Sequence, residues 1–299
     1  MNKYVGAVLG AGFAWGFMGF FTRHLSEFGI DSSGAIIVRC GLGALCFGIL
    51  ILITGASRFK VKLKDFWCFI GTGLLSLLFF TFCYFNAINM MSLSTAAILL
   101  YTAPTIVMLL SAVLFKEKIT KTKLVAAALA FAGCALVSGI TGGVSLTLSG
   151  LLFGLGSGFG YALYSIFARY ALQRGYSSNT INFYSCLLAA LGAAVIWRTN
   201  GCIKAMVSSP RAMFWCAGVG ILSCFLPYLL YTYGLTGLEN GKASVLASVE
   251  PVVASLLGIF FYHEKMTLPS FIGVVLVLSA VVLLNMKNKE EQHDQTQSA

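Results

Sequence analysis

Charged side chains are scarce in this chain. They make up 10% of its 299 residues, whereas soluble domains have about 25%. So few charges could not cover a surface that faces water. The composition therefore excludes an ordinary soluble protein.

Motifs for nucleotide hydrolysis, metal binding and catalysis are missing as well. The sequence has no GxxxxGK[ST] loop to hold the phosphates of ATP. It has only three histidines, the segment HEKMT at 263–267 is not an HExxH motif, and none of the nine cysteines forms a CxxC pair. Most cysteines lie in apolar stretches, where they are expected to be small buried residues. We predict no catalytic residue, no metal site and no cofactor, so an enzyme is not expected.

Apolar residues, in contrast, are abundant, at 58% of the sequence. A membrane-spanning helix needs about 20 of them in succession. The chain has ten such stretches, and they are 4–22, 34–54, 66–86, 96–115, 122–140, 149–168, 180–197, 212–233, 243–262 and 268–286. The first is too long for the core of a signal peptide and is followed by no cleavage pattern. We predict an all-α integral membrane protein with ten transmembrane helices, surrounded by the lipid of the cell membrane.

The net charge of +10 is interpreted as an orientation signal and not as a surface for nucleic acid. With the N-terminus inside, 14 of the 20 lysines and arginines fall in inner segments and five in outer ones, while Arg39 lies within a span. Basic residues favour the cytoplasmic side. Both termini are therefore predicted to be cytoplasmic.

One part of the sequence occurs twice. Residues 83–120 align with residues 230–267 at an offset of 147, which places Pro104 on Pro251 and Glu117 on Glu264. We predict a first repeat at 1–141, a second at 142–286 and a polar cytoplasmic tail at 287–299. Each repeat holds five spans, an odd number, so the second copy enters the membrane from the opposite side. Two inverted repeats suit a binding site between equivalent bundles.

Both copies carry a recognisable motif. The segments APTIVMLLSAVLFKEKIT and VEPVVASLLGIFFYHEKMT, together with AWG at 14–16 and VRCGLGAL at 38–45, resemble the EamA family of the drug/metabolite transporter superfamily. The resemblance covers residues 3–286 and implies ten helices in two inverted repeats and the export of small metabolites such as amino acids. The sequence departs from the family pattern at Lys116 and His263, because a glycine often stands at these two positions, directly before the glutamate of the motif.

Two charged residues lie within predicted spans. Glu250 is the only charge in the stretch 243–262, and a carboxylate inside the membrane costs about 2.5–3.5 kcal/mol. It is a candidate for binding a substrate ammonium or carrying a proton, although a glutamate near a helix start is also favoured by the helix dipole. Arg39 either extends its side chain to the interface or holds a substrate carboxylate. The two could also pair with each other.

Aromatic residues supply further candidates for substrate binding. A tyrosine inside a span needs a partner for its hydroxyl, so some tyrosines should face a polar cavity. Trp15 and Tyr161 occupy equivalent places in the two repeats at an offset of 146. The other candidates are Tyr101, Tyr164 and Tyr228.

Prolines and glutamates at matching places have expected structural roles. Pro104 and Pro251 each remove one hydrogen bond inside a helix and are predicted to kink it as hinges or cavity walls. Pro227 is predicted to bend the eighth span, with no proline at the equivalent place of the third. Glu117 and Glu264 are predicted to cap the turns that lead into the fifth and tenth spans.

The sequence thus favours a secondary transporter of small metabolites that works by alternating access. Protons are the candidate coupling ion, and the expected oligomeric state is a monomer or a homodimer. The alternative from the same superfamily is a nucleotide-sugar or organophosphate exchanger. It would need several cations in the cavity, and only Arg39 is basic well inside a span. A membrane-embedded enzyme and a channel are disfavoured further.

Overall fold

The computed structural model describes residues 2–91, 93–138, 147–197, 201–263 and 266–297. In these ranges the chain is helical and contains no β-strand, which confirms the all-α class. The helical elements of the first half are α1 (Lys3–Gly16), α2 (Met18–Ser26), α3 (Ser32–Thr54), η1 (Ala56–Phe59), η2 (Leu63–Asp65), α4 (Trp67–Ile70), η3 (Gly71–Leu78), α5 (Phe79–Met90), α6 (Leu93–Leu100), α7 (Ala103–Phe115) and α8 (Lys121–Val137). Those of the second half are α9 (Leu148–Gln173), α10 (Ser178–Trp197), α11 (Cys202–Met206), α12 (Pro210–Gly220), η4 (Ile221–Phe225), α13 (Leu226–Leu235), α14 (Asn240–Ala247), α15 (Glu250–Tyr262) and α16 (Leu268–Gln297).

Eight helical segments of the described ranges are long and apolar enough to cross a membrane. They are Lys3–Ser26, Ser33–Thr54, Leu63–Met90, Thr95–Phe115, Leu148–Gln173, Ser178–Trp197, Pro210–Leu235 and Asn240–Phe261. The fifth and tenth predicted spans are shorter, because α8 has 17 residues and the apolar part of α16 covers only Leu268–Leu284. The protein is therefore a multi-pass membrane protein, and its ten-span topology stays a prediction.

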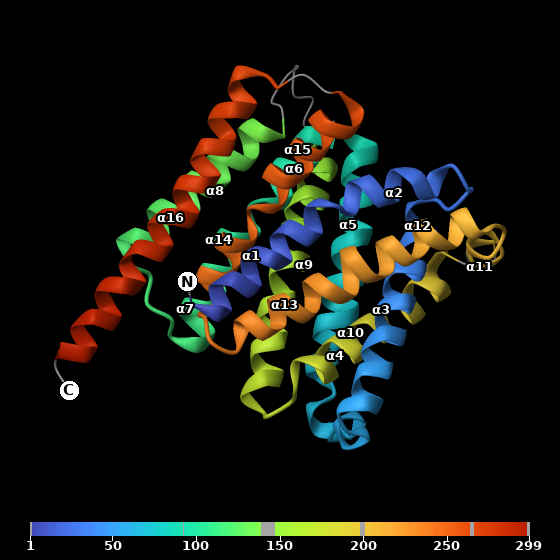
Figure 1. The fold of residues 1–299 in the computed structure, drawn as a ribbon, viewed down its shortest axis with the longest axis horizontal. Helices are drawn as coiled ribbons and strands as arrows, with labels where there is room; N and C mark the ends of the chain where they lie inside the picture. Colours follow the sequence, from blue (N-terminus) through green and yellow to red (C-terminus); the bar gives the residue numbers. More distant parts are fainter. Residues whose placement is uncertain (1, 92, 139–146, 198–200, 264–265, 298–299) are drawn as a thin grey trace.

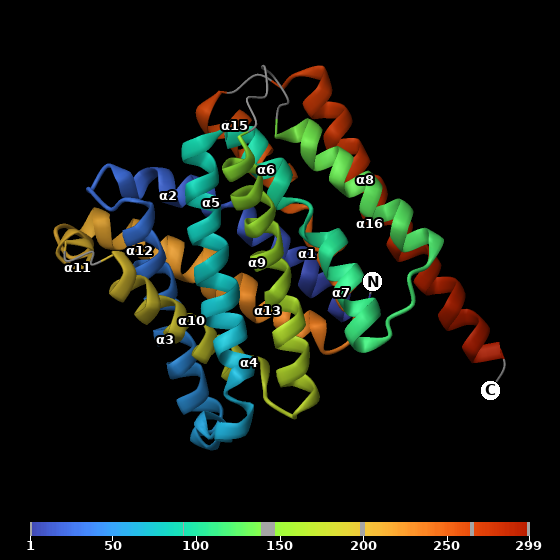
Figure 2. The ribbon, with the colours of Figure 1, turned by 180° about the vertical axis from the view of Figure 1, so that it is seen from behind.

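Helices of the two halves pack on one another in matching pairs. The first helix of each half packs on the third span of the other half, which places α1 on α13 and α9 on α5. α3 lies against α10, and α8 lies along α16 at one edge of the bundle, as both views show (Figures 1 and 2). This is the pattern that a duplicated unit with a pseudo-two-fold axis would produce.

The fourth and ninth spans are each broken in the middle. α6 stops at Leu100 before α7 begins, and α14 stops at Ala247 before α15 begins. Pro104 and Pro251 lie in the first turn of the following helix, where the missing N–H costs no hydrogen bond. The two prolines therefore restart a helix after a break instead of bending a continuous one.

Glycines on the neighbouring helices allow these breaks to pack closely. A Cβ atom on Gly12 of α1 would lie 2.8 Å from the carbonyl oxygen of Ala247, beside the break between α14 and α15. A Cβ atom on Gly158 of α9 would lie 2.9 Å from the carbonyl oxygen of Leu99, beside the break between α6 and α7. Any larger residue would push the broken helix away.

The third and eighth spans both contain a π-helical segment, η3 and η4. Pro227 follows η4 in the first turn of α13, so it lies at a distortion, as the sequence predicts. The equivalent distortion at η3 has no proline. A π-helical turn leaves backbone groups out of the regular ladder and is common at functional sites.

Lys116 and His263 end α7 and α15 in the left-handed conformation, with φ of 57° and 55°. Glycine adopts this conformation without the steric cost that a Cβ atom brings. The left-handed conformation therefore explains why a glycine is common at these two positions in the family.

Candidate functional site

Four of the predicted aromatic residues lie together at the centre of the bundle. The ring centroid of Trp15 is 6.3 Å from that of Tyr161 and 5.3 Å from that of Tyr228, and Tyr228 is 4.9 Å from Tyr164. Tyr231, which was not among the predicted site residues, also lies 5.3 Å from Trp15. These five residues form the aromatic cluster. They surround a cavity of about 10 Å³, enough for about one water molecule.

Buried polar side chains hold the tyrosines of the aromatic cluster in place. The Tyr164 hydroxyl donates to Oδ1 of Asn182 and lies 2.9 Å from Oγ1 of Thr232. The Tyr231 hydroxyl lies 2.8 Å from Oγ of Ser165. Our reading of the sequence missed these partners. Each of these partners is a polar residue inside an apolar stretch of the sequence. Because a buried polar group needs a hydrogen-bond partner, this pattern could have identified them.

Glu250 lines a second cavity beside the aromatic cluster, together with Tyr101, Pro104, Tyr161 and Ser248. This cavity measures about 20 Å³, room for water but not for a metabolite. Glu250 is the first residue of α15, so its carboxylate lies at the positive end of a half-helix. Tyr161 lines both cavities and connects Glu250 to the aromatic cluster.

Arg39 is buried on α3 and makes no ion pair with Glu250. Its Nη1 donates to the sulfur of Met18 at 2.7 Å, and its Nε has no hydrogen-bond partner among the described residues. The pairing of Arg39 with Glu250 that the sequence allowed is absent from this conformation.

Glu117 contacts a helix of the other half instead of capping its own turn. Its Oε1 accepts from the backbone N–H of Asn240 at 2.8 Å, and its Oε2 accepts from that of Gly241 at 3.2 Å. These two N–H groups begin α14 and would otherwise lack a helical partner. The prediction that Glu117 caps the turn next to it is therefore wrong, because its carboxylate binds the start of a helix 123 residues later in the sequence.

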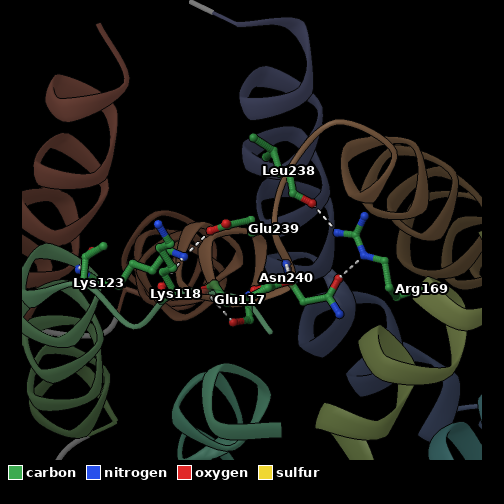
Figure 3. A network of polar contacts seen from close by, with 10 residues as sticks. Glu117, Lys118, Lys123, Arg169, Leu238, Glu239 and Asn240 are labelled. Atoms are coloured by element: carbon green, nitrogen blue, oxygen red, sulfur yellow. Dashed lines mark hydrogen bonds and ion pairs between the residues drawn. The ribbon is translucent and has the colours of Figure 1, made fainter. Parts of the chain in front are cut away.

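Two more contacts converge on the start of α14 (Figure 3). Arg169 of α9 donates to Oδ1 of Asn240 at 2.9 Å and to the carbonyl oxygen of Leu238. Lys123 of α8 pairs with Glu239. Glu117, Lys123, Arg169, Glu239 and Asn240 are called the α14 network below. Glu264, the repeat counterpart of Glu117, lies outside the described residues.

Comparison with known proteins gives a consistent result. The chain matches the EamA-like transporter family twice, over residues 2–139 and 148–286. It is 32% identical over 200 residues to an uncharacterized transporter of Archaeoglobus fulgidus, covering 67% of this chain and 70% of the relative. It is 24% identical to the uncharacterized transporter YwfM of Bacillus subtilis (97% and 96% covered) and to the uncharacterized inner membrane transporter YicL of Salmonella typhimurium (97% and 95%).

A solved crystal structure supports the fold. It superposes with a TM-score of 0.79 over 97% of this chain and 99% of the other, at 17% sequence identity. At this identity the likeness concerns the fold alone.

Proposed function

Because the chain belongs to the EamA-like transporter family, we propose that it is a secondary transporter that exports small amphipathic metabolites, such as amino acids, by alternating access. The family and the names of the relatives point to transport and away from an enzyme. The membrane is the cell membrane, as in the inner membrane relative YicL. The proposed substrate class rests on the site described above, and export is what the resemblance to the family implies.

The proposed topology has ten spans in two inverted repeats, 1–141 and 142–286, with both termini and the tail 287–299 in the cytoplasm. The two family matches and the paired packing of the halves support this arrangement. In this topology the start of α14 and the α7–α8 turn lie at the cytoplasmic end. Membrane proteins of this design place their substrate between the repeats near the middle of the bilayer.

The observation that carries the proposal is the position of the aromatic cluster and Glu250. Both lie between helices of the two halves, and Tyr161 joins them. Aromatic rings provide apolar area and hydroxyls for an amphipathic molecule, while Glu250 provides a carboxylate for an ammonium group or a proton. Arg39, buried on α3, provides the complementary charge for a substrate carboxylate.

The small size of both cavities bears on the mechanism. Volumes of about 10 and 20 Å³ do not admit an amino acid, so loading requires the halves to move apart. The α14 network closes the proposed cytoplasmic end by joining α8, α9 and α14. Opening towards the cytoplasm breaks these contacts, and closure restores them.

Counterflow in proteoliposomes tests the function. The vesicles are loaded with amino acids, amines, nucleotide sugars or sugar phosphates, and uptake of the labelled compound is followed. We expect accumulation with an amino acid or an amine. Accumulation only with a nucleotide sugar or a sugar phosphate would replace this proposal with the exchanger alternative, and no counterflow with any compound would contradict a carrier for these classes.

The role of Glu250 is tested with Glu250→Gln, which removes the charge and keeps the size. Uptake driven by a pH gradient should be lost, because the amide cannot carry a proton. If Glu250 acts only as the proton carrier, exchange counterflow persists, whereas loss of both shows that it also binds the substrate. Glu27→Gln, the same change at an exposed site on the end of α2, serves as the control. Unchanged pH dependence in Glu250→Gln would exclude the proton role.

A further inference from the structure

A basic cavity lies away from the aromatic cluster, at the end of the bundle where α3 ends and α9 turns into α10. It measures about 520 Å³ and is open to solvent on one side. Four cationic residues line it, Arg58, Lys60, Lys62 and Arg174. Figure 1 shows the turn after α3 and the turn between α9 and α10 lying together at the lower end of the bundle. This space is called the basic cavity below.

Hydrogen bonds between the two turns fix the walls of the basic cavity. The Thr180 hydroxyl donates to the carbonyl oxygen of Arg58 at 2.9 Å. The backbone N–H of Lys62 donates to the Tyr176 hydroxyl at 3.1 Å, and that hydroxyl donates to Asp65 at 2.8 Å. The backbone that carries the cations is thus tied to α10 and to the turn before it, and the cavity is a preformed part of the fold.

The charge of the basic cavity is not balanced by the protein. Asp65 is the acid next to it, and this carboxylate is already bound by Arg174 at 3.1 Å and by the Tyr176 hydroxyl. The ammonium groups of Lys60 and Lys62 have no partner among the described residues. Cations that line one cavity repel each other, and an anion in the cavity relieves that repulsion.

The start of α10 adds to the positive potential. α10 has 20 residues and begins at Ser178, directly after Ser177, which lines the basic cavity. The side chain and carbonyl of Ser177 accept from the N–H groups of Thr180 and Ile181, so the N–H groups of Ser178 and Asn179 are the ones that lack a partner within the helix, and the helix dipole places partial positive charge there. Cations combined with a helix start favour a phosphate group, which has several acceptor oxygens.

The position of the basic cavity indicates where that phosphate comes from. The spans next to it end at Thr54 and Gln173 and begin at Ser178, so it lies at the level of the lipid headgroups. The apolar residues beside it are turned outward, with Ile53 77% exposed and Leu63 89% exposed. A phosphate in the cavity thus lies next to a surface that faces acyl chains. Basic pockets between transmembrane helices bind anionic headgroups in this way.

We propose that the basic cavity binds a phosphate group, which in the membrane is that of an anionic phospholipid. Lys60 and Lys62 supply the free charges, Arg174 the positioned guanidinium, and the first N–H groups of α10 the neutral donors. This binding is independent of the transport function. In the proposed topology the site is in the cytoplasmic leaflet, where anionic lipids lie.

The test uses the purified full chain in a neutral detergent. Binding of short-chain phosphatidylglycerol, phosphatidylcholine and inorganic phosphate is titrated by thermal shift and by native mass spectrometry. Lys60→Ala combined with Lys62→Ala removes two cations from the basic cavity. Lys64→Ala combined with Lys121→Ala removes the same charge at exposed positions that do not line it, and Lys60→Arg with Lys62→Arg keeps the charge.

We expect phosphatidylglycerol to bind and phosphatidylcholine to bind much more weakly. The double alanine variant of the basic cavity should bind phosphatidylglycerol about 30-fold more weakly, because each basic residue near a membrane surface contributes about a fivefold factor. The control pair and the arginine pair should bind as the unchanged protein does. If inorganic phosphate displaces phosphatidylglycerol when the two are at equal concentration, the phosphate group that occupies the basic cavity is that of free phosphate and not that of a lipid. The site and its chemistry would be the same.

Two results would overturn the proposal. One is equal affinity of the unchanged protein for phosphatidylglycerol and phosphatidylcholine with no effect of inorganic phosphate, a result that needs no variant to fold. The other is equal loss of binding in the basic cavity pair and the control pair, since this would reflect net charge alone. Transport plays no part in these measurements, so the proposed function and this site are tested separately.

Discussion

Removing the carboxylate of Glu117 should favour the state that is open at the start of α14. Glu117→Ala deletes both hydrogen bonds to the N–H groups of Asn240 and Gly241. A hydrogen bond to a charged group contributes about 1.5–3 kcal/mol, so the two contribute about 3 kcal/mol at the lower limit. Since each 1.4 kcal/mol is a factor of ten, the ratio of open to closed molecules should rise about 150-fold.

Hydrogen–deuterium exchange measures this change without added labels. Peptides covering residues 242–249 contain buried amides of α14, among them that of Ala243, whose N–H donates to the carbonyl of Glu239 at 3.0 Å. Exchange of such amides follows the local opening equilibrium. It should therefore accelerate by a similar factor in Glu117→Ala, while exchange in α3, far from the contact, should not change.

Glu239→Ala is the matched control, because it removes a neighbouring carboxylate of the same network. The Glu239 side chain is 49% exposed and pairs with Lys123, and exposed ion pairs contribute about 0–1 kcal/mol. Exchange should rise at most about fivefold, the factor for 1 kcal/mol. If Glu117→Ala exchanges like the unchanged protein, or if Glu239→Ala has as large an effect, Glu117 does not close this end.

Two further predictions concern packing and hydrogen bonding. Gly158→Ala should cost about 1–3 kcal/mol by overpacking, since its Cβ would come within 2.9 Å of a backbone oxygen, whereas Gly41→Ala, with open space around it, should not lower the unfolding temperature. Equal stability of these two variants would contradict the close-packed break. Tyr164→Phe should cost about 0.5–1.5 kcal/mol, because it removes the hydrogen bond from the hydroxyl to Oδ1 of Asn182 while Thr232 still donates to that oxygen. Tyr228→Phe, whose hydroxyl makes no described hydrogen bond, should cost less. The same thermal unfolding series reports both, and a reversed order would refute the assignment.

The fold class was readable from the sequence because hydrophobicity decides it. Runs of apolar residues can only be spanning helices in this composition, and the repeat places Pro104 and Pro251 at equivalent positions. The breaks beside these prolines were not readable. They depend on the approach of α1 and α9 through Gly12 and Gly158, which is a tertiary contact. The π-helical segment η3 was not readable either, because it contains no proline that would mark a distortion in the sequence.

The candidate site was readable in part. Tyr161, Tyr164 and Tyr228 were found because a tyrosine inside a span needs a partner for its hydroxyl, and Trp15 because it aligns with Tyr161 in the repeat. The structure brings these four residues together. Tyr231 was not found, although it lies as near to Trp15 as Tyr228 does. The partner of Glu117 could not be inferred either, because no local pattern links it to a helix start 123 residues later.

The contact of Glu117 with α14 has a consequence for the two halves of the chain. The first N–H groups of α14 receive their acceptor from the other half of the polypeptide. In a chain of residues 148–286 alone, these N–H groups would have no acceptor from Glu117. In a chain of residues 2–139 alone, the carboxylate of Glu117 would lack both donors. Each half therefore completes a contact that the other half begins, and in the proposed topology a single copy could form it only with a second copy in the opposite orientation.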